Sequence, residues 1–138
     1  MNRNHFQQLA EVRIGEAEVL LNQGKTDGAY YLAGYSVECG LKACLSKLTN
    51  QGDFPPKPNS IRDYYSHAIE TLLKTAGLTA QRDADSAADP DLEVNWGVVK
   101  DWTEESRYER KTQAEAQQLI AAITDAAHGV LPWIKQRW

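Results

Sequence analysis

The sequence predicts an all-α fold, an up-and-down helical bundle of four long helices with one or two short helices. Apolar residues recur at steps of three and four along several segments, as on one face of a helix. No segment sustains the alternation of a strand, and no Asn-Gly hairpin signal occurs. The 138 residues, 42% of them hydrophobic, suffice for one core, so we expect a single domain over residues 1–138.

The first two helices are predicted from the apolar pattern on either side of Gly24. The first helix covers residues 3–22 and has an apolar repeat made of Phe6, Ala10, Ile14, Ala17 and Leu21. Thr26 and Asp27 form a good capping pair for the second. Its seam consists of Tyr30, Gly34, Val37, Leu41, Cys44 and Leu48. Because most turns of this second helix carry further apolar residues, we expect it to be the central and most buried element.

Two glycines and two cysteines in the second helix point to close packing. Gly34 and Gly40 would each weaken an isolated helix by roughly 1 kcal/mol relative to alanine, so we expect another backbone to approach there. Cys39 and Cys44 lie roughly 140° apart around the helix axis and cannot easily form a disulfide. We expect both to be small buried hydrophobic residues in a protein of the reducing cytoplasm.

The middle of the chain is divided by turn signals. Residues 50–60 contain three prolines and a glycine and are predicted to form a loop. A helix then starts at Ser60 or Ser66 and ends at Gly77. Residues 79–88 are polar and alanine-rich, a marginal helix at best, and Asp89 with Pro90 opens another helix in the order favoured at helix starts.

The last part of the chain begins with a polar hinge at residues 103–111. Thr112 and Glu115 form a capping box, which predicts that a long helix follows to Ile134, bent near Pro132. The four tryptophans are expected in core packing or at a dimer contact.

The charge balance limits the kinds of binding site that the protein can have. Nineteen acidic and fifteen basic side chains give a net charge of -4, so any basic site must be local. The sequence has no ligand-spaced Cys/His cluster, so we expect no metal and no cofactor, and His5 and His128 are interpreted as surface histidines. No apolar stretch approaches the length of a membrane span.

Three groups of residues are candidates for a functional site. The second helix carries a polar stripe whose members are spaced by four, three and four residues: Tyr31, Tyr35, Glu38 and Lys42. Glu38 and Lys42 have the spacing of an ion pair, which is either exposed or part of a buried network.

The second group is the polar hinge, where three positive charges surround one tyrosine: Arg107, Tyr108, Arg110 and Lys111. With the N-terminus of the following helix they could bind an anion or a nucleotide. The same charges could instead pair with Glu104, Glu105 and Glu109 on a solvated hinge.

The third group is the pair Arg62 and His67, whose spacing several metal-independent ribonucleases use. In one continuous helix these residues point about 140° apart and do not converge. A dimer, or a helix break at Ser66, could still bring them together.

The run Y30-Y-L-A-G-Y-S-V-E-C-G-L-K-A43 resembles the signature helix of HEPN-domain proteins. Two later segments, S66-H-A-I-E-T-L-L73 and S106-R-Y-E-R-K-T112, continue the resemblance in the same order, over roughly residues 5 to 134. The resemblance implies a helical bundle that usually forms a homodimer and is often encoded beside a minimal nucleotidyltransferase. Many such proteins act as ribonucleases in toxin-antitoxin or other defence systems.

Ribonuclease-active HEPN proteins resemble one another in a late motif, an arginine followed after a few residues by a histidine. The corresponding region here is Arg107-Tyr108, and no histidine follows within six residues. We therefore interpret the chain as a dimeric HEPN-like module that binds a nucleotide, RNA or a protein partner. The alternative is a metal-independent ribonuclease toxin that uses Arg62 and His67.

Overall fold

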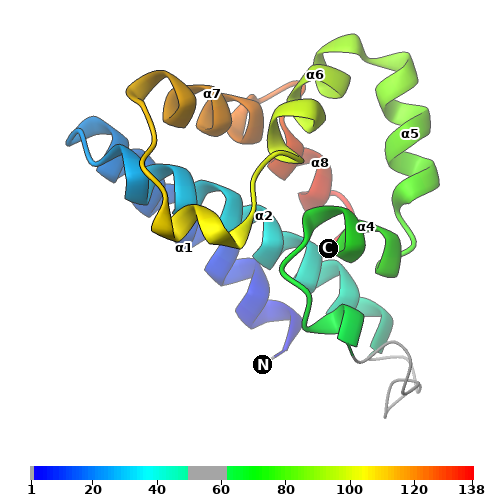
Figure 1. Cartoon of the computed structure of the whole chain (residues 1–138). Coiled ribbons are helices and arrows are strands. Elements are labelled where there is room, and N and C mark those ends of the chain that lie inside the picture. The colour runs from blue at the N-terminus through cyan, green and yellow to red at the C-terminus, as the bar shows by residue number, and fades with distance from the viewer. Residues whose placement is uncertain (1, 50–61) are drawn as a thin grey trace.

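A computed structural model describes residues 2–49 and 62–138, and these residues contain helices and no β-strand (Figure 1). The all-helical prediction is confirmed. The predicted loop at 50–60 and the predicted helix start at Ser60 lie outside the described residues. The helices are α1 (Arg3–Asn22), α2 (Thr26–Thr49), α4 (Ile69–Thr75), α5 (Thr79–Ala88), α6 (Pro90–Val99), the 3-10 helix η1 (Glu104–Tyr108), α7 (Gln113–Thr124) and α8 (Val130–Lys135).

Helices α1 and α2 form a hairpin that runs along one side of the molecule (Figure 1). The side chain of Asn2 caps α1 by accepting a hydrogen bond from the amide of His5. The turn after α1 places Gly24 at a φ of 73°, a conformation that glycine adopts without a steric penalty. The buried residues of α1, Ala10, Ile14 and Ala17, belong to the predicted apolar repeat.

Helix α2 is the central element, as predicted, because it packs against α1, α4, α7, α8 and η1. Gly34 faces the indole ring of Trp102, which follows α6, and Gly40 faces Ile134 of α8. A Cβ atom at position 34 would lie 2.3 Å from three ring carbons of Trp102. Close packing at the two glycines is confirmed, but the expected approach of another backbone is wrong, because side chains are the nearest atoms at both positions.

Two predicted helices are interrupted. The helix expected to reach Gly77 is broken at residues 65–68, and α4 starts only at Ile69. In the break, the hydroxyl of Ser66 accepts a hydrogen bond from the amide of Ala68, which competes with helical pairing.

The long last helix is also broken, at residues 125–129 instead of near Pro132. The carboxylate of Asp125 accepts hydrogen bonds from the amides of Ala127 and His128 and so stabilises a turn. Pro132 lies in the first turn of α8, where an amide has no intrahelical acceptor and proline is tolerated.

Helix α5 is a regular ten-residue helix although its sequence predicts a marginal one. Polar contacts hold it against its neighbours. Arg82 forms two hydrogen bonds with Glu70 of α4 and lies over the ring of Trp96, 5.2 Å from its centre. Asp85 accepts a hydrogen bond from the indole of Trp133. These tertiary contacts override the weak local propensity.

The two cysteines are unpaired and buried, as predicted. Burial raises the pKa of Cys39 and of Cys44 to about 11. Because the thiolate is the reactive form, we expect neither thiol to react with Ellman's reagent at pH 8 in the native protein, and both to react in urea. Rapid labelling of either thiol before unfolding would contradict the buried positions.

No helix among the described residues is both long enough and apolar enough to span a bilayer.

Candidate functional site

The polar stripe of α2 is anchored by one buried carboxylate. The side chain of Glu38 is only 1% exposed. Its Oε1 atom accepts hydrogen bonds from Lys42 Nζ at 2.9 Å and from His67 Nδ1 at 2.8 Å. Its Oε2 atom is buried and has no hydrogen-bond partner among the described residues. Glu38 and Lys42 therefore belong to a largely buried network, the second of the two arrangements that their spacing allows.

His67 connects this network to the surface. Its ring is 48% exposed, and its Nε2 atom lies 3.3 Å from a carboxylate oxygen of Glu104 in η1. The ring lines a pocket of about 360 Å³ that also includes Lys100 and Trp102. Since an ionised carboxylate can only accept, Nδ1 carries the proton in the bond to Glu38. Glu38 thereby fixes the orientation of the imidazole, as carboxylates do for histidines that transfer protons.

Arg62 is exposed on the helical turn at residues 62–64, before the break that leads to His67. No hydrogen bond or ion pair within the described part of the chain joins Arg62 to His67. The break at residues 65–68 removes the continuous helix on which their predicted divergence depended. The structure pairs His67 with Glu38 and Glu104 instead.

The two tyrosines of the stripe form an aromatic row with Trp102. Tyr31 is stacked with Tyr35 and with Trp102, and both pairs of ring centres are 6.1 Å apart. Burial and the nearby thiol of Cys39 raise the pKa of Tyr35 to about 12, so its hydroxyl stays neutral. The row fixes Trp102, which lies two residues before Glu104, and so helps to position η1 over His67.

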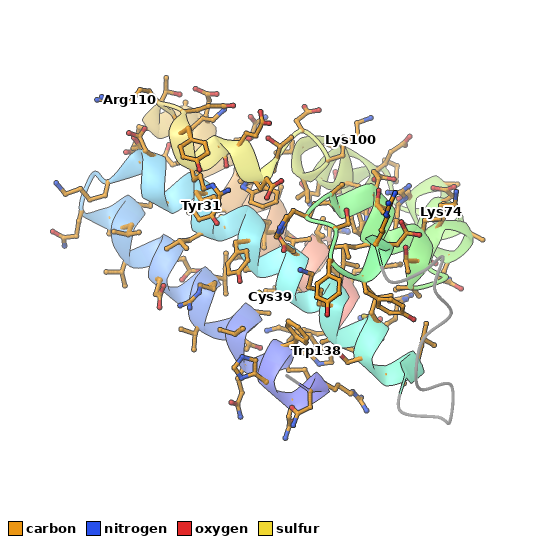
Figure 2. The ribbon with its side chains drawn as sticks, turned by 60° about the horizontal axis from the view of Figure 1, so that its bottom comes forward. Tyr31, Cys39, Lys74, Lys100, Arg110 and Trp138 are labelled. Carbon is orange, nitrogen blue, oxygen red and sulfur yellow. The ribbon has the colours of Figure 1, made fainter. Side chains whose placement is uncertain are left out.

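The predicted anion site contains three cations in different surroundings. The Arg107 guanidinium lies 5.0 Å from the ring centre of Tyr108. Tyr108 is 79% exposed and is among the most exposed large hydrophobic residues of the described part of the chain. Arg110 is 96% exposed and lies 3.2 Å from a carboxylate oxygen of Asp27. In Figure 2, Arg110 lies at the same end of α2 as Tyr31.

Lys111 is held more firmly than the two arginines. Its Nζ atom lies 3.0 Å from Glu109 and 4.5 Å from the ring centre of Tyr30. Its backbone amide donates to Asp27, and its carbonyl accepts from Thr26. Thr26 and Asp27, predicted as a capping pair, thus fasten the hinge to the start of α2.

The N-terminus of α7 has its predicted capping box. Thr112 accepts from the amide of Glu115, and the Glu115 carboxylate accepts from the amide of Thr112. Both amides are therefore already hydrogen-bonded and are not free to hold a phosphate. Arg107, Tyr108 and Arg110 consequently remain as the accessible part of the predicted anion site.

Three potential metal ligands lie together elsewhere, namely Asp89, Asp91 and His128, with one ligand atom of each within 4.8 Å of the others. Asp89 already caps α6 and bonds to His128 Nδ1 at 2.7 Å. The N-terminal end of a helix also favours negative over positive charge. These contacts describe an ion pair that joins α6 to the turn before α8.

This ion pair gives a pH prediction. The hydrogen bond to Asp89 raises the pKa of His128 above 6.5, with further contributions from Asp91 and Asp125. The stabilisation by this ion pair is complete below pH 6.5, the pKa of histidine in the unfolded chain. It is lost as the pH rises through the higher pKa of His128 in the folded protein. We expect proton NMR titration of His128 to give a pKa above 6.5. In His128→Gln, the free energy of unfolding measured in urea should lose this part of its pH dependence. An unchanged pH profile would contradict the pairing.

Sequence reasoning missed two features of the site. It did not pair Glu38 with His67, which are 29 positions apart in the chain. Sequence reasoning also considered Glu104 only as a possible counter-ion of the hinge cations. The position of His67 at the opening of a helix, noted in the resemblance, was the available signal.

Comparison with known protein families gives a match. The model of the HEPN domain family matches residues 5–137. A search of curated proteins found no match, and neither did a search of solved structures. The match covers the signature helix, the Glu38–His67 network and the hinge, so the chain belongs to the HEPN family.

Proposed function

We propose that this HEPN domain is a dimeric binding module that holds a nucleotide or single-stranded RNA without cleaving it. The observation that carries the proposal is the exposed tyrosine Tyr108, with Arg107 on its ring and Arg110 two residues beyond. An exposed ring can stack a base, and each stacked base contributes about 1–3 kcal/mol. Neighbouring guanidinium groups bind phosphate.

Two features support binding over cleavage. No histidine follows Arg107 within six residues, so the hinge lacks the histidine of the late ribonuclease motif. Arg110 is paired with Asp27 and Lys111 with Glu109, so Arg107 is the hinge cation that no ion pair compensates among the described residues, which supports weak, salt-dependent binding.

Fluorescence anisotropy with a labelled single-stranded RNA tests the proposal. We expect Arg107→Ala/Arg110→Ala to weaken binding at least tenfold and to reduce its salt dependence. The control Lys47→Ala/Lys74→Ala removes two exposed positive charges from other helices and should retain binding within twofold. Equal loss of RNA binding in both variants would show that only the net charge of the protein matters.

Tyr108→Ala separates stacking from charge, because it leaves every cation in place. We expect it to weaken RNA binding about tenfold, within the range of one lost stacking contact. Undiminished binding by this variant would contradict the proposed base site.

The second candidate function is metal-independent RNA cleavage by Arg62 and His67. It is supported by the buried carboxylate of Glu38, which orients His67 as a proton-transfer group. Purified protein would be incubated with mixed RNA in EDTA beside Arg62→Ala and Arg62→Ala/His67→Gln, with folding followed by circular dichroism. Cleavage that both folded variants lose would establish this function and displace the binding proposal.

The dimer, the partner and the setting belong to the same proposal. HEPN domains commonly dimerise, and light scattering should give twice the 15.5 kDa of one chain. We further propose that the gene lies in a toxin-antitoxin or defence context, with a nucleotidyltransferase-like protein as partner. Expression of the binding module alone should be tolerated, and the partner should copurify with it.

A further inference from the structure

Two neighbouring pockets lie on the side of the molecule formed by α4, α5, α6 and η1. One has a volume of about 440 Å³ and is lined by residues of α4, α5 and α6, together with Lys100. The other is the pocket of about 360 Å³ beside His67. Both pockets are lined by Glu70 and Lys100, so they adjoin each other. We call the two together the α4–α6 groove.

The charged side chains that line the groove are mostly acidic. It contains five carboxylates, Glu70, Asp83, Glu93, Glu104 and Glu105, against the two cations Arg82 and Lys100. Arg82 is paired with both Glu70 and Asp83, and His67 lies beside Glu104. Lys100 has no ion-pair partner among the described residues. Within the described residues, Glu93 and Glu105 have no ion-pair partner. Five carboxylates against two cations leave the groove with an excess of negative charge, and Glu93 and Glu105 are exposed carboxylates that no ion pair compensates in the described part of the chain.

Buried polar groups of the groove residues also lack partners. The indole nitrogens of Trp96 and Trp102 are buried, and no acceptor meets either of them among the described residues. The hydroxyl of Ser86 is in the same situation. Such groups are uncommon in folded proteins because an unmet buried donor costs about 1–3 kcal/mol. All three side chains line the groove, but their polar atoms are covered by neighbouring atoms, so an occupant would reach them only after the side chains move.

We propose that the α4–α6 groove docks an extended basic segment of a partner protein. Lysine or arginine side chains of such a segment pair with Glu93 and Glu105. Two adjoining pockets suit an extended chain, which advances roughly 3.3 Å per residue. Nucleic acid does not fit, because phosphates would meet the acidic lining. This site is distinct from the arginines and tyrosine proposed to bind RNA.

The probe is a fluorescein-labelled peptide of about nine alternating arginine and alanine residues, roughly 30 Å long when extended. Anisotropy at low salt would compare three variants with the unmodified protein. Glu93→Gln/Glu105→Gln removes the two uncompensated charges. Gly97→Leu places a side chain in the groove without changing charge, at a position where a Cβ meets no atom within 4 Å. Glu16→Gln/Glu18→Gln removes two charges from α1, which lies across the molecule from α5 (Figure 1).

We expect the first two variants to bind the peptide at least tenfold more weakly and the α1 variant to bind within twofold of the unmodified protein. Wild-type affinity in Gly97→Leu would overturn the proposal, because the peptide would then bind outside the groove. Equal weakening by the two glutamate pairs would overturn it as well, since only net charge would matter. Weaker binding of a labelled single-stranded RNA to Gly97→Leu than to the unmodified protein would assign the groove to nucleic acid instead. Loss of RNA binding in the Arg107 variants does not affect these outcomes.

Discussion

Gly34→Ala is expected to destabilise the domain by about 2–3 kcal/mol, the range of an overpacked core. The added Cβ would lie 2.3 Å from three carbons of the Trp102 indole, far inside contact distance. The ring is 2% exposed and stacked with Tyr31, so it cannot turn outward without breaking other contacts. The gain in helix propensity, about 1 kcal/mol, offsets only part of this cost. Urea unfolding followed by circular dichroism measures the loss.

Two other glycines provide matched controls. A Cβ at Gly40 would lie 3.1 Å from a methyl carbon of Ile134, a contact that a small shift relieves, so Gly40→Ala should cost less. A Cβ at Gly15, within exposed α1, meets no atom within 4 Å, and Gly15→Ala should stabilise by up to about 1 kcal/mol. If Gly34→Ala were as stable as Gly15→Ala, the close approach of Trp102 to α2 would be wrong.

The same substitution should disturb the site. Trp102 fixes the start of the hinge, and Glu104 follows it two residues later beside His67. A displaced indole would shift η1 and loosen the contact between Glu104 and His67. We therefore expect a change in tryptophan fluorescence to accompany the loss of stability.

The helices follow from local information, and this is why the sequence predicts them well. Apolar repeats, the capping box at Thr112 and Gly24 act within one or two turns of the chain. The two breaks depend on less regular chemistry. One is the turn stabilised by the side chain of Asp125, and the other places Ser66 and His67 outside a helix. A periodic pattern that continues through a short turn conceals such breaks.

The site is harder to predict because its contacts join distant parts of the chain. The Glu38–Lys42 spacing indicates an ion pair, yet the third member, His67, comes from beyond the predicted loop. The hinge shows the same limit. Its positive charges are visible in the sequence, but their accessibility is not. Their accessibility depends on Asp27, which reaches Arg110 from the start of α2.

Glu38→Ala is expected to cost about 3 kcal/mol, because removing one member of a buried ion pair leaves its partner uncompensated. Lys42 Nζ would lose its acceptor, and His67 would lose the bond that holds residues 65–68 against α2. Partial exposure of the Lys42 side chain keeps the cost at the lower end of the range for buried pairs. Urea unfolding measures the change, and hydrogen exchange should show faster exchange at the amides of residues 66–68.

Glu38→Gln is the matched control, since it keeps the side-chain volume and one oxygen acceptor. We expect it to cost about 1 kcal/mol, close to one ordinary hydrogen bond. Lys42→Met should partly restore the stability of Glu38→Ala, because it removes the unpaired ammonium and keeps the apolar stem. If Glu38→Ala and Glu38→Gln unfolded at the same urea concentration, the carboxylate would not hold the network together. The orientation of His67, on which the cleavage alternative rests, would then need another source.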